Sequence, residues 1–229
     1  MELKELGPVT GKTLLHLQCH IGLDTISWAR QGAICTGIDF SSGSIRAARR
    51  LANDLNIATR FLVSDVYDLP VKLHDEFDIV FTSYGAICWL PDLPRWATII
   101  SRFLKQEGFF YIVDFHPIFQ ALDQSADAKE LRLQHPYFNH GNPIVWSDDG
   151  TYASPHAHLE NRTCYTFQHH LGEIVTALLN AGLDLHWLHE FPFISYQAMP
   201  FMVPDGNGNF RLPNDELPLQ FSIKAGKSP

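Results

Sequence analysis

Aspartates follow two of the apolar runs in the first part of the chain, at positions where they could bind a nucleoside. Asp39 closes the run 33–38, and Asp65 follows the run 61–63. A turn ending in Gly22 precedes Asp39 by about 20 residues, the spacing of the acidic residue that accepts ribose hydroxyls in nucleotide-binding βαβ units. This arrangement predicts a nucleoside-type cofactor.

The elements that must position these residues can be read from the apolar periodicity. We predict strands at 14–17, 33–38, 61–63, 77–83 and 109–115, with Gly108 turning the chain into the last of them, and helices at 23–30, from Ser41 or Ser42 to about 55, and around 96–103. This order predicts an α/β fold with a right-handed, doubly wound, Rossmann-like sheet, which binds ligands at the carboxyl ends of its strands. The residues to consider are therefore 19–22, 39, 65–66, 83–85 and 114–117.

The second half of the chain is less regular. Residues 118–165 show no sustained periodicity, so we predict a lid or substrate-binding insertion, with a hairpin at 142–153 around Asp149-Gly150. A helix at 171–180 and a sixth strand at 183–191 follow. Alternation from Leu219 to Lys224 predicts a half-exposed, antiparallel seventh strand near a sheet edge. Residues 1–229 are expected to form one domain that includes this insertion.

Composition narrows the class of protein. The net charge of −8 argues against a nucleic-acid partner. The four cysteines are scattered without a CxxC pair, which is typical of reduced, cytoplasmic thiols. No apolar run approaches the ~20 residues that span a bilayer, so no membrane partner is expected.

Several segments together resemble the class I S-adenosylmethionine-dependent methyltransferases. They are LHLQCHIGLDT, TGIDFS, SDVYDLP, FDIVFTSYGAICWLPD, a late AGL and LPLQFSIKA, and the similarity runs from Thr13 to about Ala225. LHLQCHIGLDT is similar to one particular branch of that family. The resemblance implies S-adenosylmethionine as cofactor, S-adenosylhomocysteine as product, and seven strands with an antiparallel last strand.

Two features depart from the family. Its first loop usually reads DxGxGxG, and the aligned positions here are His16, Gln18, His20 and Gly22. Glycines there let the backbone approach the methionine part of the cofactor, so the loop must be reshaped. Many relatives also carry helices before the first strand that cover the cofactor. Only residues 1–12 precede it here, so we expect that the lid or a neighbouring subunit takes that role, or that the chain is truncated.

The resemblance also implies residue roles around the cofactor. Asp39 would accept ribose hydroxyls, Asp65 would accept the adenine amino group, and the Val66 amide would contact the ring edge. Gln18 and His20 would border the methionine end, and Ser83 to Gly85 would lie near the sulfonium. The full set predicted to bind the cofactor is Gln18, His20, Gly22, Asp39, Phe40, Asp65, Val66, Ser83 and Tyr84.

Methyl transfer from a sulfonium is an in-line displacement that depends mainly on alignment, and it needs a general base only for a protonated acceptor. His116, oriented by Asp114, is the candidate base, with a structural role as the alternative, and Tyr84 is a second catalytic candidate. Tyr137, Phe138, Trp146, Tyr152 and Tyr165 are predicted to form an aromatic acceptor pocket. His156, His158, His169 and His170 lack companion ligands, so no metal is predicted.

Three functions are compatible with these observations. The leading one is methyl transfer to a small-molecule acceptor by a monomer or homodimer. A non-catalytic, cofactor-binding pseudo-methyltransferase is an alternative, because the glycine loop is altered. A nicotinamide-dependent oxidoreductase is a weaker alternative, because Gln18 and His20 would crowd a pyrophosphate.

Overall fold

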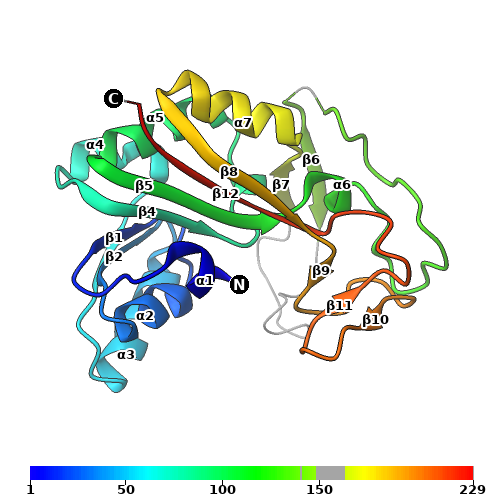
Figure 1. The fold of residues 1–229 in the computed structure, drawn as a ribbon, viewed down its shortest axis with the longest axis horizontal. Helices are drawn as coiled ribbons and strands as arrows, with labels where there is room; N and C mark the ends of the chain where they lie inside the picture. The colour runs from blue at the N-terminus through cyan, green and yellow to red at the C-terminus, as the bar shows by residue number, and fades with distance from the viewer. Residues whose placement is uncertain (140, 148–162, 229) are drawn as a thin grey trace.

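The computed structural model describes residues 1–139, 141–147 and 163–228. Its centre is a seven-stranded sheet with the order β3-β2-β1-β4-β5-β12-β8 (Figure 1). Only β12 runs antiparallel to its neighbours, β5 and β8. The predicted sheet, including its antiparallel last strand, is confirmed. Its strands are β1 Thr13–His16, β2 Ile34–Asp39, β3 Arg60–Val63, β4 Phe77–Ser83, β5 Leu104–Phe115, β8 Leu183–Phe191 and β12 Gln220–Lys227.

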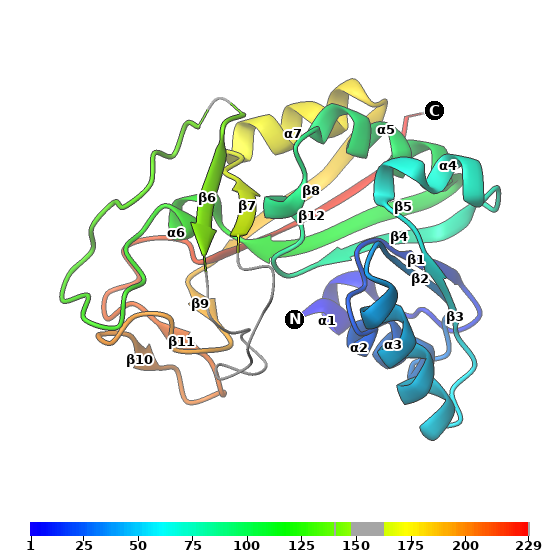
Figure 2. The same cartoon turned by 180° about the vertical axis from the view of Figure 1, so that it is seen from behind.

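Helices cover both faces of the sheet (Figures 1 and 2). On one face lie α1 Glu2–Leu6, α2 Leu23–Arg30 and α3 Ser42–Asp54. On the other lie α4 Leu69–Lys72, α5 Leu93–Phe103 and α7 Leu171–Asn180. The latter face carries the largest apolar cluster, which includes Trp96, Phe110 and Phe221. No helix among the described residues is long and apolar enough to cross a membrane.

Local signals fix several of these boundaries. The Ser41 hydroxyl accepts a hydrogen bond from the Ser44 amide, so Ser41 is the residue that caps α3. Gly182 ends α7 with a φ of 75°, which glycine adopts without steric cost. The bounds of β4, α7 and β8 agree with the prediction.

The fifth strand begins earlier than predicted. β5 starts at Leu104, and Gly108 lies within it rather than in a turn before it. The β4–β5 pairing shifts register between Phe77 and Ile79, and a Cβ on Gly108 would come within 2.9 Å of the Phe77 carbonyl oxygen. Gly108 therefore allows an irregular close approach of two paired strands.

Two insertions lie beyond the carboxyl edge of the main sheet. The first follows α6 Pro117–Gln120 and contains an antiparallel pair, β6 Pro143–Ser147 with β7 Thr163–Phe167. The strand paired with β6 thus lies further along the chain than the predicted hairpin 142–153, whose Asp149-Gly150 turn is outside the described residues.

The second insertion, between β8 and β12, was not predicted. It forms a small sheet of β9 Phe193–Ile194, β10 Val203–Pro204 and β11 Phe210–Arg211. Met199, Met202 and Leu212 from this segment pack in one apolar cluster with Phe119 of α6 and with Leu122 of the first insertion. The two insertions therefore support each other.

The prediction that the last strand is half exposed is wrong. β12 is second from the edge, and Gln220 and Ser222 are buried although their neighbours Phe221 and Ile223 face the main core. Both faces of this strand are therefore covered.

Because Ser222 is wholly buried, a charge there should be poorly tolerated. We expect Ser222→Asp to lower the free energy of unfolding by about 3 kcal/mol or more, since the carboxylate would lose its hydration. Ser27→Asp, at an exposed position of α2, is the matched control and should change it by less than about 0.5 kcal/mol. Equal effects of the two substitutions in urea titrations would contradict the buried placement.

Candidate functional site

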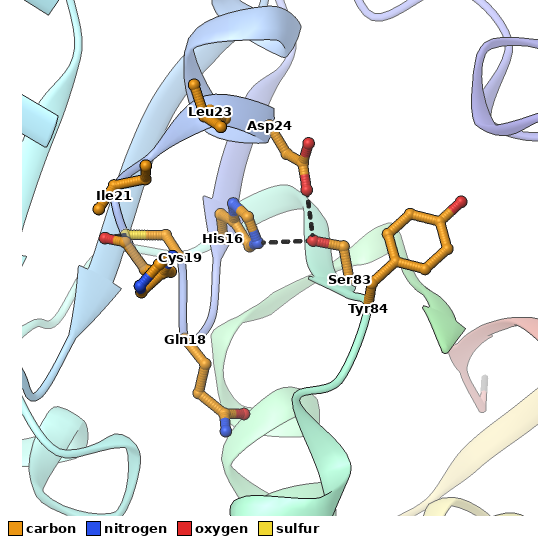
Figure 3. A pocket seen from close by; sticks show the side chains of 9 residues that line it. His16, Gln18, Cys19, Ile21, Leu23, Asp24, Ser83 and Tyr84 are labelled. Carbon is orange, nitrogen blue, oxygen red and sulfur yellow. Dashed lines mark hydrogen bonds between the residues drawn. The ribbon is translucent and has the colours of Figure 1, made fainter. Parts of the chain in front are cut away.

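A cavity of about 180 Å³ opens where the carboxyl ends of β1 and β4 meet the first turn of α2 (Figure 3). This is the point at which the strand order reverses, because β2 and β4 lie on opposite sides of β1. Open α/β sheets bind ligands at such a point. The lining residues are His16, Gln18, Cys19, His20, Ile21, Leu23, Asp24, Ser83 and Tyr84.

The loop after β1 follows a left-handed path without the usual glycines. Gln18 and His20 have φ of 54° and 50°, and Gly22 has φ of 75°. Backbone hydrogen bonds hold the loop, from the Cys19 amide to the Ile38 carbonyl at 2.8 Å and from the Gly22 amide to the Cys19 carbonyl at 2.8 Å. Hence the two non-glycine residues keep a conformation that L residues rarely adopt.

Gly22, unlike positions 18 and 20, has no room for a side chain. A Cβ at this position would lie 2.7 Å from the Phe61 ring and 2.9 Å from the Ala48 Cβ. It is also the N-cap residue of α2. Gly22 therefore lets α2 and α3 approach the loop closely.

Gln18 joins the two loops that border the cavity. Its Nε2 donates to the Ala86 carbonyl at 2.9 Å, across from the loop that follows β4. Its Oε1 is buried and accepts no hydrogen bond from the described residues. The side chain thus fixes the distance between the loops while leaving an acceptor unused.

Three side chains in the cavity form a directed hydrogen-bond chain (Figure 3). The Ser83 hydroxyl donates to Asp24 Oδ2 at 2.7 Å and lies 3.2 Å from His16 Nε2. Because the Ser83 proton points to Asp24, His16 must carry its proton on Nε2, and its Nδ1 accepts from the Thr25 hydroxyl at 2.8 Å. Burial lowers the pKa of His16 to about 4 against the raising effect of Asp24, so the imidazole is neutral at pH 7.

Sequence reasoning did not assign a role to Asp24 or Thr25. The two residues belong to the first turn of α2 and contact β1 and β4 only in the folded chain. The LDT triplet after Gly22 was visible in the sequence, but its spacing alone does not indicate a cavity.

Asp39 and Asp65 lie at the ends of β2 and β3, as predicted. The buried Asp39 carboxylate accepts from the His20 amide at 2.9 Å and from the Ser41 amide at 2.8 Å. Asp65 is exposed, and its Oδ1 caps the short helix η1 Val66–Asp68 through the Tyr67 amide at 2.8 Å. Both carboxylates retain acceptor capacity, since an ionised carboxylate can accept about four hydrogen bonds.

Phe40 and Val66 stand beside these aspartates in different environments. The Phe40 ring is 74% exposed, whereas the Val66 side chain is buried in the main core. A large apolar ring left in solvent next to Asp39 is available to pack against a planar ligand group.

Asp114 shapes the loop after β4 and does not orient His116, which corrects the predicted pairing. Its carboxylate accepts from the amides of Gly85 at 2.5 Å, Ala86 at 3.1 Å, Ile87 at 3.1 Å and Phe115 at 2.7 Å. Burial raises the pKa of Asp114 in spite of these bonds.

His116 is held outside the cavity lining. Its Nδ1 accepts from the Ile118 amide at 3.1 Å and so caps α6, while its Nε2 lies 2.9 Å from Glu190 Oε1. Burial lowers the pKa of His116, opposed by Glu190. The contacts give it a structural role, and its role as a base remains a prediction.

Tyr84 connects the cavity to the N-terminal helix. Its hydroxyl donates to Glu2 Oε1 at 2.8 Å, and burial, followed by the Glu2 charge, raises its pKa. The Tyr111 hydroxyl donates to Glu5 Oε2 at 2.7 Å in the same helix. The short segment before β1 therefore reaches a wall of the cavity.

The predicted acceptor residues fall into two groups. The ring centroids of Trp146 in β6 and Trp89 in η2 Ile87–Trp89 are 6.5 Å apart. The helix η2 follows the loop that Asp114 holds, and both indoles are partly exposed. Tyr137 instead packs edge-on against Phe138 and accepts from the Leu171 amide at the start of α7. Tyr165 lies exposed on β7, and Tyr152 is outside the described residues.

The candidate histidine ligands are used structurally. His169 Nε2 donates to the Leu90 carbonyl at 2.6 Å, and His170 caps α7 by accepting from the Glu173 amide at 3.0 Å. His156 and His158 lie outside the described residues. Within the described ranges no group of His, Cys, Asp and Glu could hold a metal ion.

The sheet order, the reversal-point cavity and the strand-end aspartates define the class I methyltransferase fold. A family model described as a methyltransferase domain matches residues 15–112. The chain is therefore similar to a methyltransferase domain over these residues, which make up less than half of its length.

Individual curated proteins show the same partial similarity. The chain is 28% identical over 120 residues to a ubiquinone biosynthesis O-methyltransferase of Alkalilimnicola ehrlichii, covering 52% of this chain and 45% of the relative. It is 31% identical over 111 residues to the protein of the same name from Pasteurella multocida, covering 45% and 46%. The matches thus span less than half the length of these relatives.

Solved structures share the fold across almost the whole chain. An S-adenosylmethionine-dependent methyltransferase from Mesorhizobium loti aligns with a TM-score of 0.66 at 18% identity, covering 98% of this chain and 95% of that one. Magnesium protoporphyrin IX methyltransferase from Synechocystis, with bound S-adenosylhomocysteine, gives 0.60 at 13% identity, covering 99% and 78%. At these identities the likeness concerns the fold.

The neutral, buried His16 should make stability depend on pH. Its pKa falls from 6.5 in the unfolded chain to about 4, so the unfolded state binds more protons as pH drops through this window. The stabilisation is complete above pH 6.5, and about 3 kcal/mol of it is lost by pH 4. We expect His16→Asn to lose less stability than the parent between pH 7 and pH 4 in urea titrations. Parallel profiles would contradict the assignment.

The left-handed backbone at His20 predicts a gain from glycine. An L residue in this region costs roughly 1–2 kcal/mol, part of which is offset by the greater unfolded-state entropy of glycine. We expect His20→Gly to raise the free energy of unfolding by about 0.5–1 kcal/mol. Arg46→Gly in the interior of α3 is the control and should lower it by about 1 kcal/mol. Destabilisation of the same size by both would show that the His20 side chain outweighs the backbone strain.

Proposed function

We propose that the protein transfers a methyl group from S-adenosylmethionine to a small-molecule acceptor. The observation that carries this proposal is the cavity at the reversal point of the sheet, bordered by a left-handed loop and flanked by Asp39 and Asp65 at adjacent strand ends. The match of residues 15–112 to a methyltransferase-domain model and the shared fold support the same cofactor.

The proposed cofactor lies along the carboxyl edge of the sheet. Its adenosine part sits over the ends of β2 and β3, where Asp39 accepts the ribose hydroxyls and Asp65 accepts the adenine amino group. Phe40 packs against the adenine ring, and the Val66 amide contacts the ring edge. The methionine part enters the cavity between Gln18–Gly22 and Ser83-Tyr84.

The reaction is an in-line displacement. The acceptor atom forms a bond to the methyl carbon as the carbon–sulfur bond breaks, and S-adenosylhomocysteine leaves with the electron pair of that bond. The loop after β4, held by three hydrogen bonds to Asp114, sets the position of Tyr84 at this point. Alignment of this kind supplies most of the rate enhancement in such a transfer.

The acceptor side is formed by aromatic residues. Trp89 and Trp146 present partly exposed indoles beyond the same loop, which suits an acceptor with an apolar or planar part. Two relatives are named for O-methylation in ubiquinone biosynthesis, which favours a small acceptor of this type. The four free thiols fit a reducing, cytoplasmic setting.

Isothermal titration with S-adenosylmethionine and S-adenosylhomocysteine tests the cofactor. We expect both to bind the parent protein and Asp39→Ala to weaken binding about 100-fold or more, since two charge-assisted hydrogen bonds to the ribose are lost. Asp54→Ala, an exposed carboxylate at the end of α3, should bind like the parent. Failure of the folded parent protein to bind either ligand would refute the proposed function.

An assay for the formation of S-adenosylhomocysteine from S-adenosylmethionine tests turnover. The candidate acceptors are phenols, catechols, amines and thiols. Product formed with one class would identify the acceptor atom. Cofactor binding with no product from any class would favour the non-catalytic alternative.

A further inference from the structure

The cavity has a carboxylate, but at a different place from the one expected for this class. His16 occupies the position that aligns with the acidic residue of the family loop, and it is buried and neutral. The carboxyl group among the lining residues belongs to Asp24, which enters from the first turn of α2 (Figure 3). Negative charge in the cavity is thus supplied by another element.

The hydrogen-bond chain points toward this carboxylate. Thr25 donates to His16, His16 donates to Ser83, and Ser83 donates to Asp24 Oδ2. Each donor orients the next, so the Asp24 carboxylate is fixed on the cavity wall. Its second oxygen, Oδ1, receives no hydrogen bond from the described residues. One acceptor is therefore held in place and left for a ligand.

The charge of the lining matches one part of the proposed cofactor. No lysine or arginine lines the cavity. The amino-acid end of S-adenosylmethionine carries an α-ammonium group with three N–H donors, and its sulfonium carries a positive charge without a proton on sulfur. A carboxylate forms strong charge-assisted hydrogen bonds with the ammonium and none with the sulfonium.

A carboxylate against the sulfonium would also compete with the acceptor, because a carboxylate oxygen can itself take the methyl group. Asp24 Oδ2 accepts a hydrogen bond from the Ser83 hydroxyl at 2.7 Å, so one oxygen of this carboxylate is already engaged. Contact with the ammonium keeps the carboxylate away from the transferred methyl group.

We propose that Asp24 binds the α-ammonium group of the cofactor, replacing the acidic residue whose position His16 occupies. The inference rests on the proposed function and assigns to Asp24 a binding role, with Ser83 as the residue that positions it. Ligands that keep the amino-acid end should depend on Asp24, and those that lack it should not.

Titration of three ligands into the full chain and its Asp24→Asn variant tests this. The ligands are S-adenosylmethionine, S-adenosylhomocysteine and 5′-methylthioadenosine, which lacks the amino-acid end. Asparagine keeps the size and the acceptor for Ser83 while removing the charge. We expect the first two to bind about 10- to 100-fold more weakly, by similar factors, and the third to bind unchanged. Asp54→Asn is the matched control for loss of one surface charge.

The other outcomes overturn the inference in distinguishable ways. Weakening of S-adenosylmethionine alone would place Asp24 at the sulfonium, and equal weakening of all three ligands would show that Asp24 only maintains the cavity. Unchanged binding of all three would remove Asp24 from recognition. Absence of binding to the parent protein would instead refute the proposed function.

A second variant keeps the test independent of the asparagine substitution. Ser83→Ala retains the Asp24 charge but removes its hydrogen-bond donor, so we expect about a threefold to tenfold loss for the two amino-acid-bearing ligands and none for 5′-methylthioadenosine. Asp24→Glu should recover part of the loss seen with asparagine. A loss with glutamate as large as that with asparagine would argue against recognition by charge.

Discussion

The Asp39 carboxylate is the contact on which the cavity depends. It accepts from the His20 amide in the loop after β1 and from the Ser41 amide at the start of α3. Without this bridge, a loop with two non-glycine residues at positive φ would have little reason to keep its path, because each costs roughly 1–2 kcal/mol. Charge-assisted hydrogen bonds of about 1.5–3 kcal/mol each are large enough to oppose that strain. The residue expected to bind ribose therefore also shapes the neighbouring loop.

The opposite wall is built by the same means. Asp114 collects the amides of Gly85, Ala86 and Ile87, which would otherwise be hard to satisfy at a strand end. Gln18 then fastens the Ala86 carbonyl to the first loop. Each wall thus rests on one buried carboxylate, and Gln18 couples the two. The cavity is preorganised by the protein alone, which reduces the ordering that a ligand must bring about.

Much of this fold could be predicted from the sequence, because β4 is a continuous apolar run and α7 is an amphipathic helix ended by Gly182. The burial of both faces of β12 could not be predicted. Its small polar residue Ser222 reads as a solvent-facing position, yet β12 is enclosed between β5 and β8. Strand-end residues of the site, such as Asp39 and Asp65, follow from chain order. The role of Asp24 does not follow from chain order, because its partner Ser83 is 59 residues away and contacts it only when α2 packs on the sheet.

The altered loop is better explained as a redistribution of roles than as damage. The loop has its left-handed path at a conformational cost, Gln18 contacts Ala86, and a carboxylate is presented from α2. His16 is neutral because burial lowers its pKa against the raising effect of Asp24, and its Nε2–H orients Ser83 toward Asp24. In the proposed role, Asp24 would supply the negative charge that the residue at the His16 position lacks.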